Sequence, residues 1–220
     1  MIRITKGAKP AILVANADEW RKALLDCHTA HQPVPDGLAN AYNCVEIKDA
    51  LREESRHKCM YCESAISHVA HEHIEHFRPK ARTKYPELTF EWTNLGLACP
   101  VCNVSKSDDF DENCAHVNPY SEDPTEFFVA EGPMVFPRLG NARAELTWES
   151  VKLYRAGLIE KRAEKLSSLQ LMLRAYTDEP NALMKEIWKR RIKEEIEADN
   201  EYSFCLQAFV ASQLGAHFLL

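Results

Sequence analysis

The sequence has no apolar run that approaches the roughly 20 residues needed to cross a bilayer. It also shows no secretory signal, because its most suggestive stretch, residues 11–17, offers only about five apolar residues after Pro10. Its 220 residues, 45% hydrophobic and 27% charged, have the composition of an ordinary globular protein of one or two domains. We therefore expect a cytoplasmic protein that does not use a membrane.

Net positive charge is also missing: 27 Lys and Arg stand against 33 Asp and Glu, which gives −6. Proteins that bind nucleic acid without specificity are normally basic, so the balance argues mildly against that class. Residues 56–106 differ, because seven Lys or Arg and five Glu leave this stretch at +2 and the remainder at −8. Within it, alternate positions carry the basic strip Arg78, Lys80, Arg82 and Lys84. The strip is either a solvated face or a set of phosphate contacts.

The eight cysteines are not needed as staples, because a chain of this length can bury a sufficient core. Four of them form two Cys-x2-Cys pairs, Cys59/Cys62 and Cys99/Cys102. Two such pairs in an intracellular protein favour structural Zn²⁺, because four thiolates complete a closed tetrahedral site. Disulfides are disfavoured, because they need an oxidising compartment and we see no targeting signal for one. A redox-active Cys-x2-Cys is disfavoured as well, because it needs a βαβ context that the sequence does not show. The remaining four we expect to be core or inert residues: Cys27, Cys44, Cys114 and Cys205.

Apolar spacing predicts helices over about 16–27, 38–57, 151–176, 183–196 and 202–210, and short strands over 126–130, 134–136 and 144–148. The 151–176 stripe is interrupted at Arg162. We divide the chain into three regions: an N-terminal helical region (1–57), a motif-bearing module (58–110), and a final segment (111–220) in which irregular chain and short strands precede helices.

Between the two cysteine pairs, and just after the second, lie Glu75, His76, Asn94 and Asn103. Hydrolysis of a phosphodiester needs a general base near neutral pH, which suits a histidine held in one tautomer. It also needs a hard divalent cation, which prefers oxygen ligands such as those of Glu and Asn. A zinc knuckle can hold such short elements rigidly. The residues required for this chemistry therefore occur together within a short stretch.

The run Glu75-His76-Phe77-Arg78-Pro79, then Asn94-Leu95, then Cys99-x2-Cys102-Asn103-x2-Lys106, resembles the HNH endonuclease family. The resemblance implies an α+β protein with a treble-clef-like ββα-metal centre and a structural zinc, embedded in a mainly helical chain. It also implies roles: Glu75 and Asn103 would bind the catalytic cation, His76 would be the general base, and Asn94 would orient His76. At position 75 this sequence has Glu where the family more often has Asp, and at position 103 it has Asn where the family more often has His. The oxygen ligand that Asn103 would offer points to Mg²⁺ or Mn²⁺. The basic strip and Lys106 would contact nucleic acid.

A second register is open, because Glu72-His73-Ile74 also has the order acid, histidine and isoleucine. It lacks the proline that follows His76 at Pro79, so we favour Glu75 and His76. His68 and His71 we expect to be exposed or to act only indirectly on the ligands.

Further segments narrow the resemblance: Tyr61-Cys62-Glu63, the run 74–80, Tyr85-Pro86 and Trp92-x-Asn94-Leu95. They are similar to an HNH subgroup that includes the nuclease subunit of Septu-type anti-phage defence and the effector of some retron systems. The resemblance implies DNA as substrate and a separate ATPase subunit as partner. The alternative is a non-catalytic zinc module that binds nucleic acid or protein, but such a module has no use for Glu75, His76, Asn94 and Asn103 together. DNA versus RNA, sequence preference, the trigger and the stoichiometry stay open.

Overall fold

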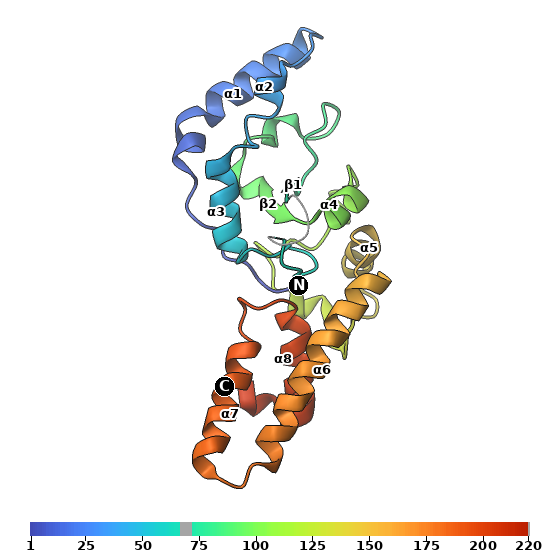
Figure 1. Ribbon diagram of the computed structural model, residues 1–220. Helices are drawn as coiled ribbons and strands as arrows, with labels where there is room; N and C mark the ends of the chain where they lie inside the picture. Colours follow the sequence, from blue (N-terminus) through green and yellow to red (C-terminus); the bar gives the residue numbers. More distant parts are fainter. Residues whose placement is uncertain (67–71, 220) are drawn as a thin grey trace.

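A computed structural model describes residues 1–66 and 72–219 of the chain (Figure 1); His68 and His71 lie outside the described residues. Helices surround a small central hairpin, and a separate group of helices forms the lower part of the molecule. The N-terminal helices are α1 (Ala11–Thr29), α2 (Asp36–Ala39) and α3 (Val45–Ser55). Single 3₁₀ turns occupy Pro86–Leu88, Trp92–Asn94, Pro124–Glu126 and Ala216–Leu219. In the described ranges no helix is both long and apolar enough to span a membrane.

The centre of the molecule is a ββα unit. Strand β1 (His73–His76) pairs antiparallel with β2 (Leu95–Ala98), so that His73 lies opposite Ala98 and His76 opposite Leu95. Every residue of β2 is buried, and α3 packs on this strand through its apolar face. Helix α4 (Pro100–Lys106) begins directly after β2, with a proline at its first position, where no backbone N–H is required. The expected α+β fold with a ββα centre is confirmed.

Two helix boundaries differ from the expectation. Helix α1 begins at Ala11, directly after Pro10, and Asn16 lies inside it with its side-chain Nδ2 donating to the Ile12 carbonyl. The helix therefore starts five residues before the 16–27 range that the apolar spacing predicts. The single helix expected over 38–57 is divided into α2 and α3, and residues 40–44 form the turn between them.

A second hairpin follows the ββα unit. Strands β3 (Phe128–Glu131) and β4 (Met134–Pro137) pair antiparallel, and Gly132 takes the positive φ of 57° that their tight turn needs. The third strand expected over 144–148 is wrong, because this segment belongs to helix α5 (Ala142–Ser150). Asn141 caps that helix by accepting the Ala144 N–H at 3.0 Å, and Ala144 and Thr147 are its buried face at helical spacing.

The C-terminal helices are α6 (Ala156–Asp178), α7 (Ala182–Glu195) and α8 (Ser203–Leu214). They share a second apolar core, while the larger core runs from Met1 to Leu158 and takes in the start of α8. Arg162, which interrupts the apolar stripe of α6, is buried and donates to the carbonyl of Leu153 at 3.1 Å. The larger core crosses positions 57 and 110, so the three-region division stays a prediction.

The loop that carries Cys59 and Cys62 is anchored to the segment before α8. The Lys58 ammonium donates to the Asn200 carbonyl at 2.7 Å, and the Ala65 N–H donates to the Glu201 carboxylate at 2.8 Å. Glu63, which has a positive φ of 64°, accepts a hydrogen bond from the Ser203 hydroxyl at 2.9 Å. The segment that leads into α8, together with the first residue of that helix, therefore holds this loop in place.

The close approach of this loop to β2 gives a first prediction. A Cβ added at Gly96 would lie 2.5 Å from Met60 Sδ and 3.1 Å from the Tyr120 ring. Met60 and Tyr120 are packed against the core, so we expect Gly96→Ala to lower the free energy of unfolding by about 1–3 kcal/mol. The matched control is Gly157→Ala in α6, where a Cβ meets nothing within 4 Å; it is expected to be neutral or to stabilise by up to about 1 kcal/mol. Urea denaturation measures both, and equal effects would contradict the close packing of Gly96.

Candidate active site and zinc centre

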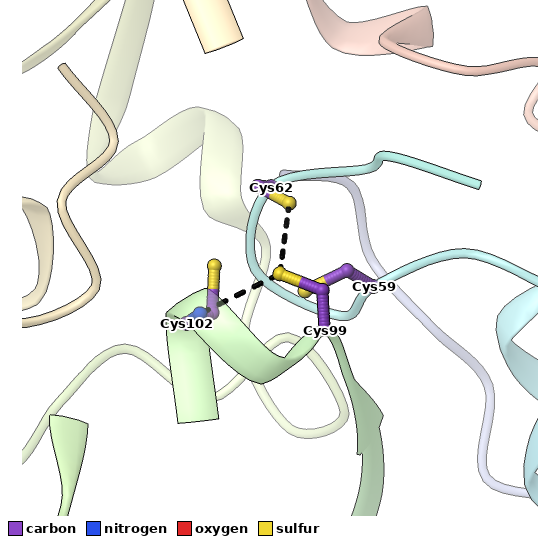
Figure 2. Close-up of side chains that lie close together, drawn as sticks. All are labelled: Cys59, Cys62, Cys99 and Cys102. Atoms are coloured by element: carbon purple, nitrogen blue, oxygen red, sulfur yellow. Dashed lines mark hydrogen bonds between the residues drawn. The ribbon is translucent and has the colours of Figure 1, made fainter. Parts of the chain in front are cut away.

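The four paired cysteines converge at one point. Cys59 and Cys62 come from the anchored loop, Cys99 is the N-cap residue of α4, and Cys102 lies in its first turn (Figure 2). Their sulfur atoms all lie within 4.8 Å of one another, and Cys62 Sγ is 3.8 Å from Cys99 Sγ. A tetrahedral zinc with Zn–S bonds of about 2.3 Å separates its sulfurs by about 3.8 Å. The donor set and spacing therefore fit a closed structural zinc site.

The surroundings of the cluster also suit a metal thiolate centre. The Arg155 guanidinium places Nη1 3.6 Å from Cys102 Sγ and Nη2 3.9 Å from Cys99 Sγ. Burial raises the pKa of the Cys59 thiol well above its ordinary value, so a cation bound nearby would favour its thiolate form. The N-terminus of α4 adds the positive end of a helix dipole next to these sulfurs.

Beside the zinc centre, a cavity of about 330 Å³ lies between β1 and α4. It is lined by Tyr42, Ile74, Glu75, His76, Pro79, Lys80, Asn103, Val104, Ser107 and Asp108. Glu75, His76 and Asn103 thus line one cavity, although Asn103 is far from the other two in sequence. Their meeting follows from the ββα geometry, because β1 and α4 are joined through β2 and held by the cysteine cluster.

Glu75 is almost fully buried, at 2% exposure, and one of its oxygens is engaged twice. Glu75 Oε1 accepts the Tyr61 hydroxyl at 3.1 Å and forms an ion pair with Lys106 Nζ at 2.9 Å. Burial raises the pKa of the Glu75 carboxyl, and the nearby Lys106 ammonium opposes that shift. Both contacts are made at Oε1, so Oε2 is the oxygen left for a cation.

His76 is held by a backbone carbonyl rather than by a side chain. Its Nε2 lies 3.0 Å from the Thr89 carbonyl oxygen, which assigns the proton to Nε2 and leaves the lone pair on Nδ1. The ring lies edge-on to Tyr42, with centroids 4.6 Å apart. Burial lowers the pKa of His76 to about 4, so the imidazole is neutral at pH 7 and can accept a proton.

Asn94, which the resemblance expects to orient His76, makes its hydrogen bonds to the backbone and none to the imidazole. Its Oδ1 accepts the Arg78 N–H at 2.8 Å, and its Nδ2 donates to the carbonyls of Arg78 at 3.0 Å and Leu88 at 3.2 Å. The side chain thus closes both ends of the loop between β1 and β2. This loop includes Thr89, whose carbonyl contacts His76, so Asn94 braces the loop that supplies the partner of the imidazole.

Asn103 and His73 form a second pair between α4 and β1. The Asn103 Nδ2 lies 3.0 Å from His73 Nδ1, which turns the amide oxygen of Asn103 away from this ring. Glu72, the acid of the alternative register, forms an ion pair with Arg52 of α3. Neither Glu72 nor His73 lines the cavity. Glu75 and His76 share the cavity with Asn103, whereas His73 contacts Asn103 from outside the cavity lining and Glu72 is paired elsewhere.

The basic residues differ from one another in their surroundings. The loop that carries the basic strip is made of turns, so alternate spacing does not place these side chains on one face. Arg78 and Lys84 are exposed, Lys80 lines the cavity, and Arg82 donates to the His28 carbonyl at 2.8 Å. Lys106 is a correction: its side chain is 0% exposed and paired with Glu75, so it is not a surface contact for phosphate.

Comparison with known proteins agrees with this geometry. Residues 59–109 match the family model described as HNH endonuclease. This segment is an HNH endonuclease domain. The chain is 28% identical to Septu protein PtuB of Bacillus mycoides (strain KBAB4), over 86% of this chain and 79% of that protein. It is 36% identical to Septu protein PtuB of Bacillus thuringiensis over 36% of this chain and 30% of that protein.

Three residues that surround the HNH site were missed by sequence reasoning. Tyr42 comes from the turn between α2 and α3, and Thr89 contributes only its backbone carbonyl. Arg155 precedes α6 and reaches the cysteine cluster from outside the domain. A backbone contact leaves no residue-type signal in the sequence, and neither Tyr42 nor Arg155 belongs to a spaced motif. The fold alone brings them to the site.

The cysteine cluster gives a second prediction. Because its ligands join the loop before β1 to α4, metal binding energy at this site is also folding energy. We expect Cys59→Ser or Cys99→Ser to lose bound zinc and soluble protein together, whereas Cys27→Ser, outside the cluster, should lose neither. Elemental analysis of purified protein, combined with thermal melting, measures this. Less than about half a zinc per well-folded chain would contradict a closed four-thiolate site.

Proposed function

We propose that this chain is a metal-dependent HNH endonuclease that hydrolyses DNA phosphodiester bonds, as the effector subunit of an anti-phage defence complex with an ATPase. The observation that carries the proposal is the single cavity lined by Glu75, His76 and Asn103 inside the HNH domain. These side chains offer a neutral base and two oxygen ligands in one place. A module that only bound nucleic acid or protein would not need this combination.

In this mechanism His76 is the general base. Its Nδ1 takes a proton from the attacking water, while the Thr89 carbonyl keeps hold of the proton on Nε2. The low pKa of about 4 keeps the ring unprotonated over the physiological pH range. The imidazolium that forms is transient, and the same carbonyl stabilises it through the Nε2 hydrogen bond.

Glu75 and Asn103 would hold the catalytic cation through Oε2 and Oδ1. Both are hard oxygen donors, which favours Mg²⁺ or Mn²⁺ over a softer ion. When bound, such a cation neutralises charge on the scissile phosphate and stabilises the leaving oxygen. His73 supports Asn103 by accepting its amide N–H, and this fixes the direction of the amide oxygen.

The four cysteines would hold a structural Zn²⁺ that has no part in the chemical step. Lys80, which lines the cavity, and the exposed Arg78 and Lys84 are the basic side chains best placed to contact phosphates near the cut. Arg82 could join them by releasing the His28 carbonyl.

The ATPase partner is supported by the similarity to Septu protein PtuB together with the charge distribution. Residues outside 56–106 carry a net charge of −8, which disfavours tight independent binding to DNA, because phosphate contacts supply most non-specific affinity. A nuclease that cut freely would also damage its own cell. A partner that brings the DNA to the nuclease would compensate for the weak binding, and a partner that controls cleavage would protect the cell.

The catalytic assignment gives a third prediction. His76→Ala should lower the rate of plasmid cleavage by about 10²–10⁴-fold in Mg²⁺ or Mn²⁺, because a general base acts in the chemical step. DNA affinity and melting temperature should change little. His73→Ala is the matched control from the same strand and should retain cleavage at a reduced apparent affinity for the cation.

An inactive His73→Ala combined with an active His76→Ala would show that the other register is correct. A chain that holds zinc, binds DNA and never cuts, with or without its partner, would instead favour the non-catalytic zinc module.

The partner gives a fourth prediction. Co-expression of this chain with its proposed ATPase partner should yield one complex in size-exclusion chromatography. The complex should cut DNA under control of nucleotide or an infection signal, whereas the purified chain alone should cut poorly. Two separate proteins, together with vigorous cleavage by the chain alone, would remove the regulatory proposal and leave the endonuclease.

A further inference from the structure

A lysine occupies the interior of the candidate active site. Lys106 has a side chain that is 0% exposed, and its ammonium lies 2.9 Å from Glu75 Oε1 and 3.4 Å from the His76 carbonyl. Lysine is almost never fully buried unless it is paired, so the ion pair with Glu75 is what allows this burial. The same carboxylate that would hold the catalytic cation therefore already holds a cation of the protein itself.

The charges around the cavity cancel. Glu75 and Asp108 contribute two negative charges, and Lys80 and Lys106 contribute two positive ones. Asn103 is uncharged, so the acidic and basic side chains around the site sum to zero. Sites for hard divalent cations gain affinity from the number of charged ligands they offer. A site whose charges cancel, and whose proposed carboxylate ligand Glu75 is already paired with Lys106, offers little affinity for a divalent cation.

A divalent cation at Glu75 Oε2 would share its carboxylate with the Lys106 ammonium at Oε1. Charges of the same sign at such short range repel strongly where water is excluded, and Lys106 cannot turn out to solvent because it is completely buried. A negative charge supplied from outside would offset this repulsion. The phosphate of a nucleic acid strand brought next to His76 supplies one.

We infer that Lys106 makes cation binding depend on the substrate: the divalent cation is held weakly by the free protein and firmly only when a nucleic acid phosphate enters the cavity. The inference rests on the proposed function and assigns Lys106 as a positioning residue rather than a catalytic one. Linkage requires the reciprocal effect, so the cation should strengthen nucleic acid binding by the same factor. The cavity would then hold its divalent cation firmly only when the substrate is bound.

The test measures Mn²⁺ affinity rather than cleavage. Mn²⁺ is titrated calorimetrically at pH 8 into His76→Ala protein, which keeps both proposed cation ligands and does not cut. The titration is made alone and with a DNA duplex at a concentration that fluorescence anisotropy shows to be saturating. We expect Mn²⁺ to bind at least about tenfold more tightly with the duplex present. Equal affinities would overturn the inference.

The second arm adds Lys106→Met to the same background. Methionine keeps most of the lysine stem, and the Tyr61 hydroxyl still holds Glu75 Oε1, so the carboxylate keeps a partner. We expect this change to raise Mn²⁺ affinity of the DNA-free protein by about tenfold or more and to reduce the effect of the duplex. Lys106→Arg is the matched control, because it retains the charge and should leave affinity weak. Unchanged or weaker Mn²⁺ binding by a folded Lys106→Met protein would overturn the role of Lys106.

Two further variants separate this inference from the proposed function. Glu75→Gln and Asn103→Ala should both abolish the Mn²⁺ signal. If they leave it unchanged, the ion binds elsewhere, and the proposed function loses its cation site. If they abolish it while wild-type affinity does not depend on DNA, only the coupling is wrong. Should Lys106→Met fail to fold, the comparison with and without duplex still decides the inference.

Discussion

Four cysteine sulfurs within 4.8 Å of one another join the loop before β1 to the first turn of α4. This junction fixes how the helix lies against the strand. Residues three apart on α4, Asn103 and Lys106, then face residues two apart on β1, His73 and Glu75, at 3.0 and 2.9 Å. Without the junction, a helix of seven residues has too little apolar surface to hold this register. Each further feature of the site depends on it.

Glu75 and His76, neighbours on β1, have different electrostatic surroundings. The charge of Glu75 is buried and balanced, because its carboxylate lies between a tyrosine hydroxyl and an ammonium. The His76 ring is buried against Tyr42 and a carbonyl oxygen, and burial keeps it neutral. A base that is neutral at pH 7 can accept a proton, and an ionised carboxylate beside it can bind a cation. Acid–base chemistry that uses a metal ion needs both roles in one site.

The sequence was most informative where chemistry dictates residue type and spacing together. The paired cysteines and the combination of Glu75, His76 and Asn103 could be recognised because few other functions need those residues at those intervals. The strand expected over 144–148 failed because alternation over five residues also fits a helix with a capping Asn141. The expectation that Lys106 contacts nucleic acid failed because a basic residue is normally on the surface. The burial of Lys106 becomes clear only from its pairing with Glu75 in the fold. Thr89 could not be found, since any residue supplies a carbonyl.

The central claim is that the four-cysteine zinc centre and the cation site in the cavity are two separate sites. Anomalous diffraction from crystals of the His76→Ala protein with a DNA duplex and Mn²⁺ would test it most directly. The account predicts a zinc peak among the four sulfurs and a manganese peak between Glu75 Oε2 and Asn103 Oδ1, next to a phosphate. A manganese peak at Glu72 and His73, with no peak in the cavity, would contradict it.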